Sequence, residues 1–499
     1  MTLRIAYAGI IQLVAQFATL LTGLIFVTIV TRNLSVNEFG LWQTLGSSVG
    51  LLLIPLAPIN YWALRYSARN HDVGKTSLLS GMITIPIFVL IYVGIALTAS
   101  ASIESILVYV LIYSVQIPML CIWEVARPIA RSYKPEYLGY ATIGLELGKV
   151  LAAYYTISIL RMGLTGAILS LALGQLIQII IIVYIIRPKI RGRFQFPVIK
   201  KWYKSAWIPI SNVSISRLSI ADSIVVSLIL GSTAVVGIFQ ASKIFTLIIR
   251  YSETFVRILY PKLIRDKINS DITLTIKLQS FFLVPLVVGA ITLSESLLGV
   301  LGPQYSATGI ILRILTIVAI MEGIEFFVWN ILTGIEQIDE NIDNLEFRKL
   351  RNSWLVRLPL IDISKSVIYF IILGTIMYNF RDLGSQLTLA IYWSVILLLI
   401  TLPVMVYKII LLKRTITFEF PTATIMKYVG SGIVMAVFLY SYQQVFFKTE
   451  TTVIASIKYL IIPGITSVLI YLIVVYLTDP FIKKAILEVK STIFKKNKL

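Results

Sequence analysis

The sequence predicts an all-α membrane protein that crosses the bilayer about 14 times. Hydrophobic residues make up 58% of the 499 positions and only 14% are charged, which is more apolar surface than a soluble protein of this length could bury. Apolar runs of about 20 residues recur, and each could cross a hydrocarbon core of about 30 Å. Because the runs are continuous rather than alternating, they predict helices.

The apolar runs fall into three successive groups. The predicted spans cover 5–30, 39–62, 78–99, 104–126, 137–160 and 163–186, then 205–230, 234–258, 274–300 and 305–333, and finally 355–378, 385–411, 424–446 and 454–478. The first run follows Arg4 and is too long for the apolar core of a signal peptide, so we interpret it as the first span.

A short internal repeat predicts two similar halves. Residues 34–43, LSVNEFGLWQ, align without a gap with residues 231–240, GSTAVVGIFQ, at an offset of 197. Both segments end in glycine, an apolar residue, an aromatic residue and glutamine. Each joins an odd-numbered span to the next, so the repeat is parallel. We expect three regions: an N-terminal six-helix lobe at 1–200, a C-terminal six-helix lobe at 201–415, and two additional helices with a basic cytoplasmic tail at 416–499.

The basic residues predict that both termini lie in the cytoplasm. The formal net charge is +20, and in membrane proteins Lys and Arg concentrate in cytoplasmic loops. The connections after even-numbered spans carry most of them, including Arg65, Arg69, Lys75, Arg127, Arg131, Lys134, Arg187, Lys189, Arg191, Arg193, Lys262, Arg265, Arg348, Lys349, Lys408, Lys413 and Arg414. The positive charge therefore indicates multi-pass topology in the cell membrane and not nucleic-acid binding.

The residue inventory excludes several kinds of site. One cysteine, Cys121, cannot form an intramolecular disulfide framework, and one histidine, His71, cannot form a multi-histidine metal centre. We expect no cofactor, no metal site and no catalytic residue.

Three cations within one predicted span are the clearest functional signal. Lys243, Arg250 and Arg257 recur every seven residues, which places them on nearly one face of a helix of about 3.6 residues per turn. Charges in a membrane helix usually face the bundle interior or a water-filled cavity. The alternative is that Arg250 and Arg257 reach the lipid headgroups or pair with Glu253.

The preceding span carries a further cation, Arg217, about 18 Å along its helix. This position is too central for the guanidinium to reach the headgroups easily, and Asp222 is its candidate partner. We expect Arg217, Lys243 and Arg250 to face a cavity that binds an anionic substrate, with Arg257 at the membrane surface.

Other polar residues are weaker candidates for the same cavity. Gln12 and Gln16 begin a polar stripe on the first span, which fits either a pathway or close helix packing. Asn60 follows Pro55 and Pro58, which should distort the second span.

The acidic residues of the predicted spans allow two interpretations. Glu322 and Glu325 could bind a proton or Na⁺ and couple transport to a gradient, or they could balance the cations of span eight. Two pairs at i, i+3 predict structural ion pairs instead: Glu146 with Lys149, and Asp362 with Lys365.

The chain resembles the oligosaccharide-flippase branch of the multidrug/oligosaccharidyl-lipid/polysaccharide (MOP) exporter superfamily. The resemblance is carried by LSVNEFGLW at 34–42, DSIVV at 222–226, VGIFQASK at 236–243, LYPK at 259–262, and GPQY at 302–305 after an apolar run. It implies a V-shaped pair of six-helix lobes around a central cavity, with two extra helices. It also implies transfer of lipid-linked sugars from the cytoplasmic to the outer leaflet.

The combined prediction is a flippase for an anionic lipid-linked oligosaccharide, used in assembling a surface polysaccharide or glycoprotein glycan. The cations would bind the phosphate or pyrophosphate linkage, and the two lobes would alternate access. The expected partners are this substrate, membrane lipids, a coupling H⁺ or Na⁺, and glycan-assembly proteins. One alternative is an H⁺- or Na⁺-coupled exporter of drugs or metabolites. The other is a membrane glycan polymerase or glycosyltransferase, for which the predicted outer connections are short.

Overall fold

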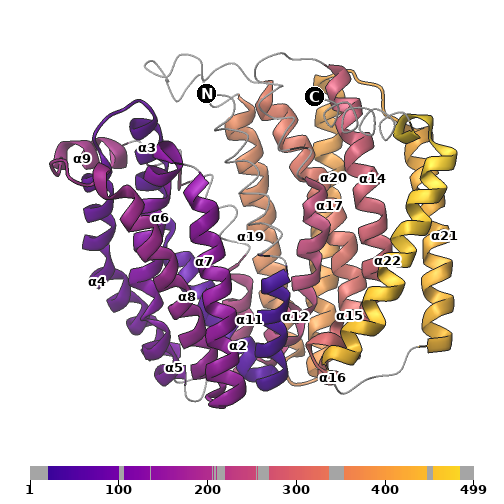
Figure 1. Ribbon diagram of the computed structural model, residues 1–499, viewed down its shortest axis with the longest axis horizontal. Helices are drawn as coiled ribbons and strands as arrows, with labels where there is room; N and C mark the ends of the chain where they lie inside the picture. Colours follow the sequence, from indigo (N-terminus) through magenta and orange to yellow (C-terminus); the bar gives the residue numbers. More distant parts are fainter. Residues whose placement is uncertain are drawn as a thin grey trace, which may run out of the picture. The chain divides into compact units, whose positions relative to one another are not determined.

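The fold is helical throughout the part of the chain that the structure, a computed structural model, describes (Figure 1). The described residues are 19, 21–99, 106–134, 136–204, 206, 209–210, 220–253, 256, 269–335, 353–446 and 453–483. Within these ranges, ten helices are long and apolar enough to cross a membrane, and a shorter apolar helix covers Leu21–Asn33. The predicted all-α polytopic membrane class is therefore confirmed.

The chain divides into two compact units. Unit 1 comprises Met1–Gln240 and Phe370–Leu389, and unit 2 comprises Ala241–Tyr369 and Ala390–Leu499. All three boundaries between the units fall inside helices, so α12, α19 and α20 each contribute residues to both units. The division into lobes at 1–200 and 201–415 with two further helices at 416–499 stays a prediction.

Unit 1 contains the first helices of the chain. They are α2 (Val36–Leu52), α3 (Ala57–Ala68), α4 (Gly74–Ala99), α5 (Ile106–Tyr113), α6 (Gln116–Tyr133), α7 (Glu136–Ala153), α8 (Gly163–Ile186), α9 (Phe196–Lys204), α11 (Asp222–Leu230) and the start of α12 (Ala234–Ile249). Ser35 and Glu38 form a capping box that begins α2. The predicted distortion by Pro55 and Pro58 is confirmed, because α2 ends at Leu52 and a 3-10 turn precedes α3.

Helices α7 and α8 pack closely along their length (Figure 1). A Cβ atom at Gly174 would lie 2.8 Å from the backbone oxygen of Leu145, and one at Gly148 would lie 3.2 Å from the Cα of Gly174. Small residues at both positions let the two backbones approach, as is common for helix pairs within membranes.

Unit 2 contains the remaining helices of the described chain, although the end of α19 and the start of α20 belong to unit 1. They are the end of α12, α14 (Asn269–Thr292), α15 (Ser294–Leu301), α16 (Pro303–Ser306), α17 (Gly309–Gly334), α19 (Trp354–Phe380), α20 (Gln386–Thr415), α21 (Thr422–Phe446) and α22 (Val453–Thr478). One apolar cluster joins Ile276, Val328, Leu358 and Leu412, which lie on α14, α17, α19 and α20. Three of these helices, α17, α19 and α20, carry the buried charged residues described below.

The two segments of the internal repeat contact each other within unit 1. A Cβ atom at Gly40 would lie 1.8 Å from the backbone oxygen of Thr233, and one at Gly237 would lie 2.2 Å from the backbone oxygen of Val36. Thr233 and Val36 are themselves equivalent at the offset of 197. The contact is therefore locally symmetric, and only glycine leaves room for the two backbones at either position.

Hydrogen bonds accompany this crossing. The Asn37 Oδ1 atom accepts from the backbone N–H of Thr233 at 3.0 Å, and the Thr233 hydroxyl donates to the backbone oxygen of Asn37 at 2.7 Å. Further along α2, the hydroxyls of Thr44 and Ser227 are hydrogen-bonded at 3.0 Å, and both are buried. The crossing between α2 and the segment α11–α12 is thus both close-packed and polar.

Candidate functional site

The structure describes two of the three cations predicted to bind an anionic substrate. Lys243 is half-buried on α12, and Arg250 follows the end of this helix in a 3-10 turn. The guanidinium of Arg250 pairs with the carboxylate of Glu322 on α17, and their side chains are 43% and 35% exposed. Glu322 therefore balances a cation of span eight, which is one of the two interpretations left open by the sequence. Arg217 and Arg257 lie outside the described residues, as do Gln12 and Gln16.

Asp222 occupies the first position of α11 and is 1% exposed. Its Oδ1 atom accepts from the backbone N–H of Ser223 at 2.7 Å, where a carboxylate also opposes the positive end of the helix. The amide of Gln240 on α12 donates to the Ser223 hydroxyl at 2.8 Å. The surroundings of Asp222 thus tie α11 to α12, and its predicted pairing with Arg217 is not tested.

Asn60 contacts a neighbouring helix within unit 1. Its amide donates to the backbone oxygen of Glu124 at 2.8 Å and to the Glu124 carboxylate at 3.0 Å. Arg127 donates to the same carboxylate at 3.0 Å. The sequence predicts Arg127 in a loop, but α6 extends past it to Tyr133, so its charge belongs to a helix.

Replacing Asn60 by alanine should lower the free energy of unfolding by about 1–3 kcal/mol, because the partly buried Glu124 loses two hydrogen bonds. Thermal unfolding can be followed with a thiol-reactive fluorophore, since the single cysteine, Cys121, is buried in the fold. Asn33→Ala is the control, because that amide donates to Ile29 within its own helix. Equal losses for the two variants would contradict a cross-helix role for Asn60.

One predicted ion pair forms and the other does not. The Lys149 Nζ atom lies 2.7 Å from the Glu146 carboxylate, which also accepts from the Thr22 hydroxyl at 2.6 Å, so this pair is confirmed. Asp362 and Lys365 instead bond to residues of other helices, and the prediction that they pair with each other is wrong. Their alternative partners are much farther along the chain, which spacing within one helix cannot reveal.

Four charged residues from three helices meet in unit 2, and we call them the charge cluster: Glu325 on α17, Asp362 and Lys365 on α19, and Lys408 on α20. The Lys408 ammonium donates to Glu325 at 2.8 Å and to Asp362 at 2.5 Å. Lys365 donates to the other oxygen of Glu325 at 2.8 Å. The Lys408 side chain is 2% exposed, so these charges are compensated by one another and not by solvent.

Lys408 is the functional candidate that sequence reasoning missed. The sequence predicts it, with Lys413 and Arg414, in the connection after the twelfth span, but it lies inside α20 and is buried. A signal was present in the sequence, because Glu325 has no basic residue on its own helix nearer than Arg313. A buried carboxylate in a membrane helix requires a partner from another helix.

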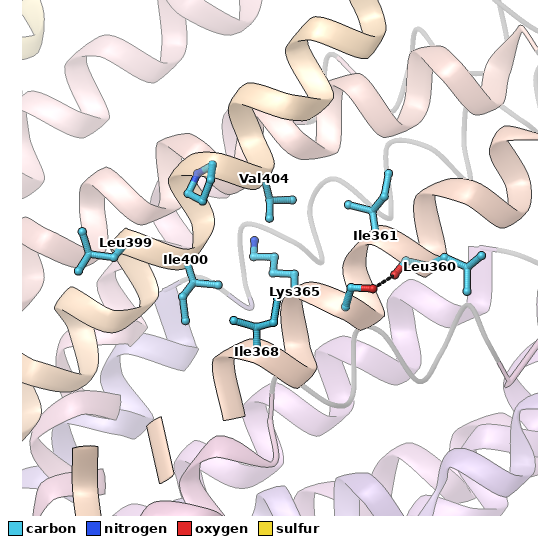
Figure 2. A pocket seen from close by; sticks show the side chains of 9 residues that line it. Leu360, Ile361, Lys365, Ile368, Leu399, Ile400 and Val404 are labelled. Carbon is cyan, nitrogen blue, oxygen red and sulfur yellow. Dashed lines mark hydrogen bonds between the residues drawn. The ribbon is translucent and has the colours of Figure 1, made fainter. Parts of the chain in front are cut away.

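An apolar groove of about 410 Å³ adjoins the charge cluster. It is lined by Leu360, Ile361, Ser364, Lys365, Ile368, Leu399, Ile400, Pro403 and Val404. Figure 2 shows the Lys365 side chain extending from α19 toward α20, near Ile400 and Val404. Lys365 is therefore the member of the cluster that borders the groove.

Among the described residues, no group of three or more His, Cys, Asp or Glu side chains could hold a metal ion. The arrangement in unit 2 is one of carboxylates matched by ammonium and guanidinium groups. It can hold charge within a membrane protein.

Solved structures similar to this chain include a flippase and multidrug resistance transporters. "Lipid II flippase MurJ, inward closed conformation" superposes with a TM-score of 0.70 at 15% identity, covering 96% of this chain and 100% of the other. An inward-facing multidrug resistance MATE family transporter of the MOP superfamily has a TM-score of 0.57 at 14% identity, covering 80% of this chain and 96% of the other.

An outward-facing MATE structure gives a TM-score of 0.53 at 14% identity over 83% of this chain and 96% of the other. No protein-family model and no curated protein matches the sequence. The chain therefore has the fold of MOP-superfamily transporters, as the sequence resemblance predicted. These three structures are named as a flippase and two transporters.

Proposed function

We propose that this chain, which has the fold of the MOP transporters, is a flippase for an anionic lipid-linked oligosaccharide. The observation that carries the proposal is the likeness to the lipid II flippase MurJ, which spans 96% of this chain and all of the other. MurJ is described as a flippase of lipid II, so a lipid substrate of the same chemical kind is the first candidate here. The destination would be a surface polysaccharide or a glycoprotein glycan.

The residues of unit 2 support an anionic substrate. Lys243 and Arg250 carry positive charge on and just after α12, and Arg250 is exposed enough to contact a second anion beside Glu322. A guanidinium has five N–H donors and matches phosphate geometry well. The sequence also predicts Arg217, Gln12, Gln16, Asn60 and Asp222 as candidates for a substrate cavity.

The proposed mechanism is alternating access between the two six-helix lobes, 1–200 and 201–415, with two additional helices and a basic cytoplasmic tail at 416–499. We place the protein in the cytoplasmic membrane with both termini in the cytoplasm, because the basic residues concentrate in alternate connections. Membrane lipids, glycan-assembly proteins and a coupling H⁺ or Na⁺ are its proposed partners.

Reconstitution tests this function directly. Proteoliposomes containing the full chain should expose a fluorescent pyrophosphate-linked oligosaccharide lipid to an external quencher faster than protein-free liposomes do. The double variant Lys243→Gln/Arg250→Gln should slow this exposure about tenfold or more. Losing a charge-assisted contact to the substrate should raise the activation free energy of transport by about 1.4 kcal/mol or more.

The matched control is Lys413→Gln/Arg414→Gln, which removes two exposed cations from the last turn of α20. It should transport at the wild-type rate. Wild-type protein that fails to accelerate exposure would contradict the flippase proposal, and equal slowing by both double variants would contradict the role of Lys243 and Arg250.

A second candidate is export of drugs or metabolites, which the likeness to the MATE transporter favours. Cationic drugs would need an acidic cavity, whereas the candidate residues on and after α12 are basic. If the protein is a glycolipid flippase, deletion of its gene should leave drug susceptibility unchanged. Increased susceptibility, reversed by the intact gene, would favour this candidate over the flippase.

A further inference from the structure

The charge cluster of unit 2 contains a pair of carboxylates with a cation already held between them. Glu325 and Asp362 come from α17 and α19, and the Lys408 ammonium from α20 lies 2.8 Å and 2.5 Å from their oxygens. A lysine ammonium is a compact monovalent cation with three donors. It therefore occupies the place that a small monovalent ion would take between the same two carboxylates.

The two lysines of the charge cluster have different roles. Lys408 bonds to both acids and its side chain is 2% exposed, whereas Lys365 bonds only to Glu325 and its side chain is 18% exposed beside the groove (Figure 2). Each Glu325 oxygen thus accepts from a different lysine. Lys408 is the cation that bridges the carboxylates, and Lys365 completes the balance of charge.

The formal charges of the cluster sum to zero, because two carboxylates face two ammonium groups. Glu322, one helical turn before Glu325, is paired with Arg250 and adds no uncompensated charge. A metal cation bound in addition would leave a net positive charge in a buried site next to an apolar groove, which is unfavourable.

We propose that Lys408 is a built-in replacement for a bound monovalent cation, and that shortening this side chain opens a Na⁺ site between Glu325 and Asp362. Unit 2 of the natural protein then binds no Na⁺ at this place. Removing the ammonium leaves two carboxylates and Lys365, so one added cation restores neutrality. The inference concerns ion binding and does not depend on the identity of the transported substrate.

The test compares two variants of the full chain that lose the same charge. Lys408→Ala removes the ammonium and makes room, whereas Lys408→Met removes the ammonium but fills the space with a side chain of similar length. Thermal unfolding of each purified protein is measured in NaCl and in N-methyl-D-glucamine chloride at equal ionic strength, with the fluorophore that reports exposure of Cys121.

Without Na⁺, both variants should unfold about 5 °C or more below wild type. Titrated Na⁺ should restore Lys408→Ala saturably, because a ligand that binds only the folded state raises its stability. Lys408→Met and wild type should show no specific Na⁺ effect. Failure of Na⁺ to restore Lys408→Ala, or equal restoration of Lys408→Met, would overturn the proposal.

A second measurement applies even where Lys408→Ala does not accumulate as folded protein. Equilibrium binding of radioactive Na⁺ to the purified wild type should show no difference from the charge-balanced double variant Glu325→Gln/Lys365→Met. Saturable binding to wild type that this double variant abolishes would show that the natural site takes a metal ion, and would overturn the proposal. Failure of the wild-type protein to transport the glycolipid in proteoliposomes would contradict the proposed function and would leave the inference about Lys408 unaffected.

Discussion

Replacing Gly40 by leucine is expected to destabilise the fold by about 3 kcal/mol or more and to abolish transport. Even the first atom of the new side chain would lie 1.8 Å from the Thr233 oxygen and 2.8 Å from the Gly237 nitrogen. Both are backbone atoms, so a change of rotamer cannot relieve the overlap. The crossing between α2 and α12 would have to open.

The symmetric change, Gly237→Leu, should have a similar effect, because its Cβ would lie 2.2 Å from the backbone oxygen of Val36. Gly289→Leu on α14 is the control, since a Cβ atom there meets nothing within 4 Å. Thermal unfolding and glycolipid exposure in proteoliposomes measure the two consequences. Wild-type stability in either crossing variant would show that the close approach of the repeated segments is not required.

Replacing Glu325 by glutamine is the second change for which we expect a large effect, a loss of about 3–5 kcal/mol of stability. Glu325 accepts from both Lys365 and Lys408, so its neutralisation leaves two ammonium groups facing Asp362 alone. An uncompensated charge in a buried site has few ways to be solvated. Thermal unfolding of the purified full chain measures the loss.

Glu322→Gln is the matched control for Glu325→Gln. It lies one turn away on the same helix and also has a cationic partner, but that pair is partly exposed, so the loss should stay below about 1 kcal/mol. The double variant Glu325→Gln/Lys365→Met restores neutrality and should be more stable than Glu325→Gln alone. If the two substitutions instead destabilise additively, charge balance is not what makes Glu325 important.

Much of the architecture could be predicted from the sequence because it depends on local patterns. Continuous apolar runs predict membrane helices, Pro55 and Pro58 predict the break between α2 and α3, and i, i+3 spacing correctly pairs Glu146 with Lys149. The repeated glycines were visible as an alignment of two segments. Apart from this alignment, each of these signals lies within one helix or the turn beside it.

The pairing of the remaining charges could not be predicted in this way. Glu325 and Lys408 are 83 residues apart, Asp362 and Lys408 are 46 apart, and Arg250 and Glu322 are 72 apart. The sequence predicts an ion pair between Asp362 and Lys365 because they are neighbours on one helix. Packing of α17, α19 and α20 brought different partners within bonding distance.

The sequence by itself determined that this is a helical, multi-pass membrane protein with buried charges that need explanation. Only the tertiary structure decided which charge neutralises which, that Lys408 is buried instead of exposed in a loop, and that Gly40 and Gly237 contact each other's segments. The physical reason is that hydrophobicity and helix periodicity are properties of a segment, whereas compensation of a buried charge requires groups that only packing brings together.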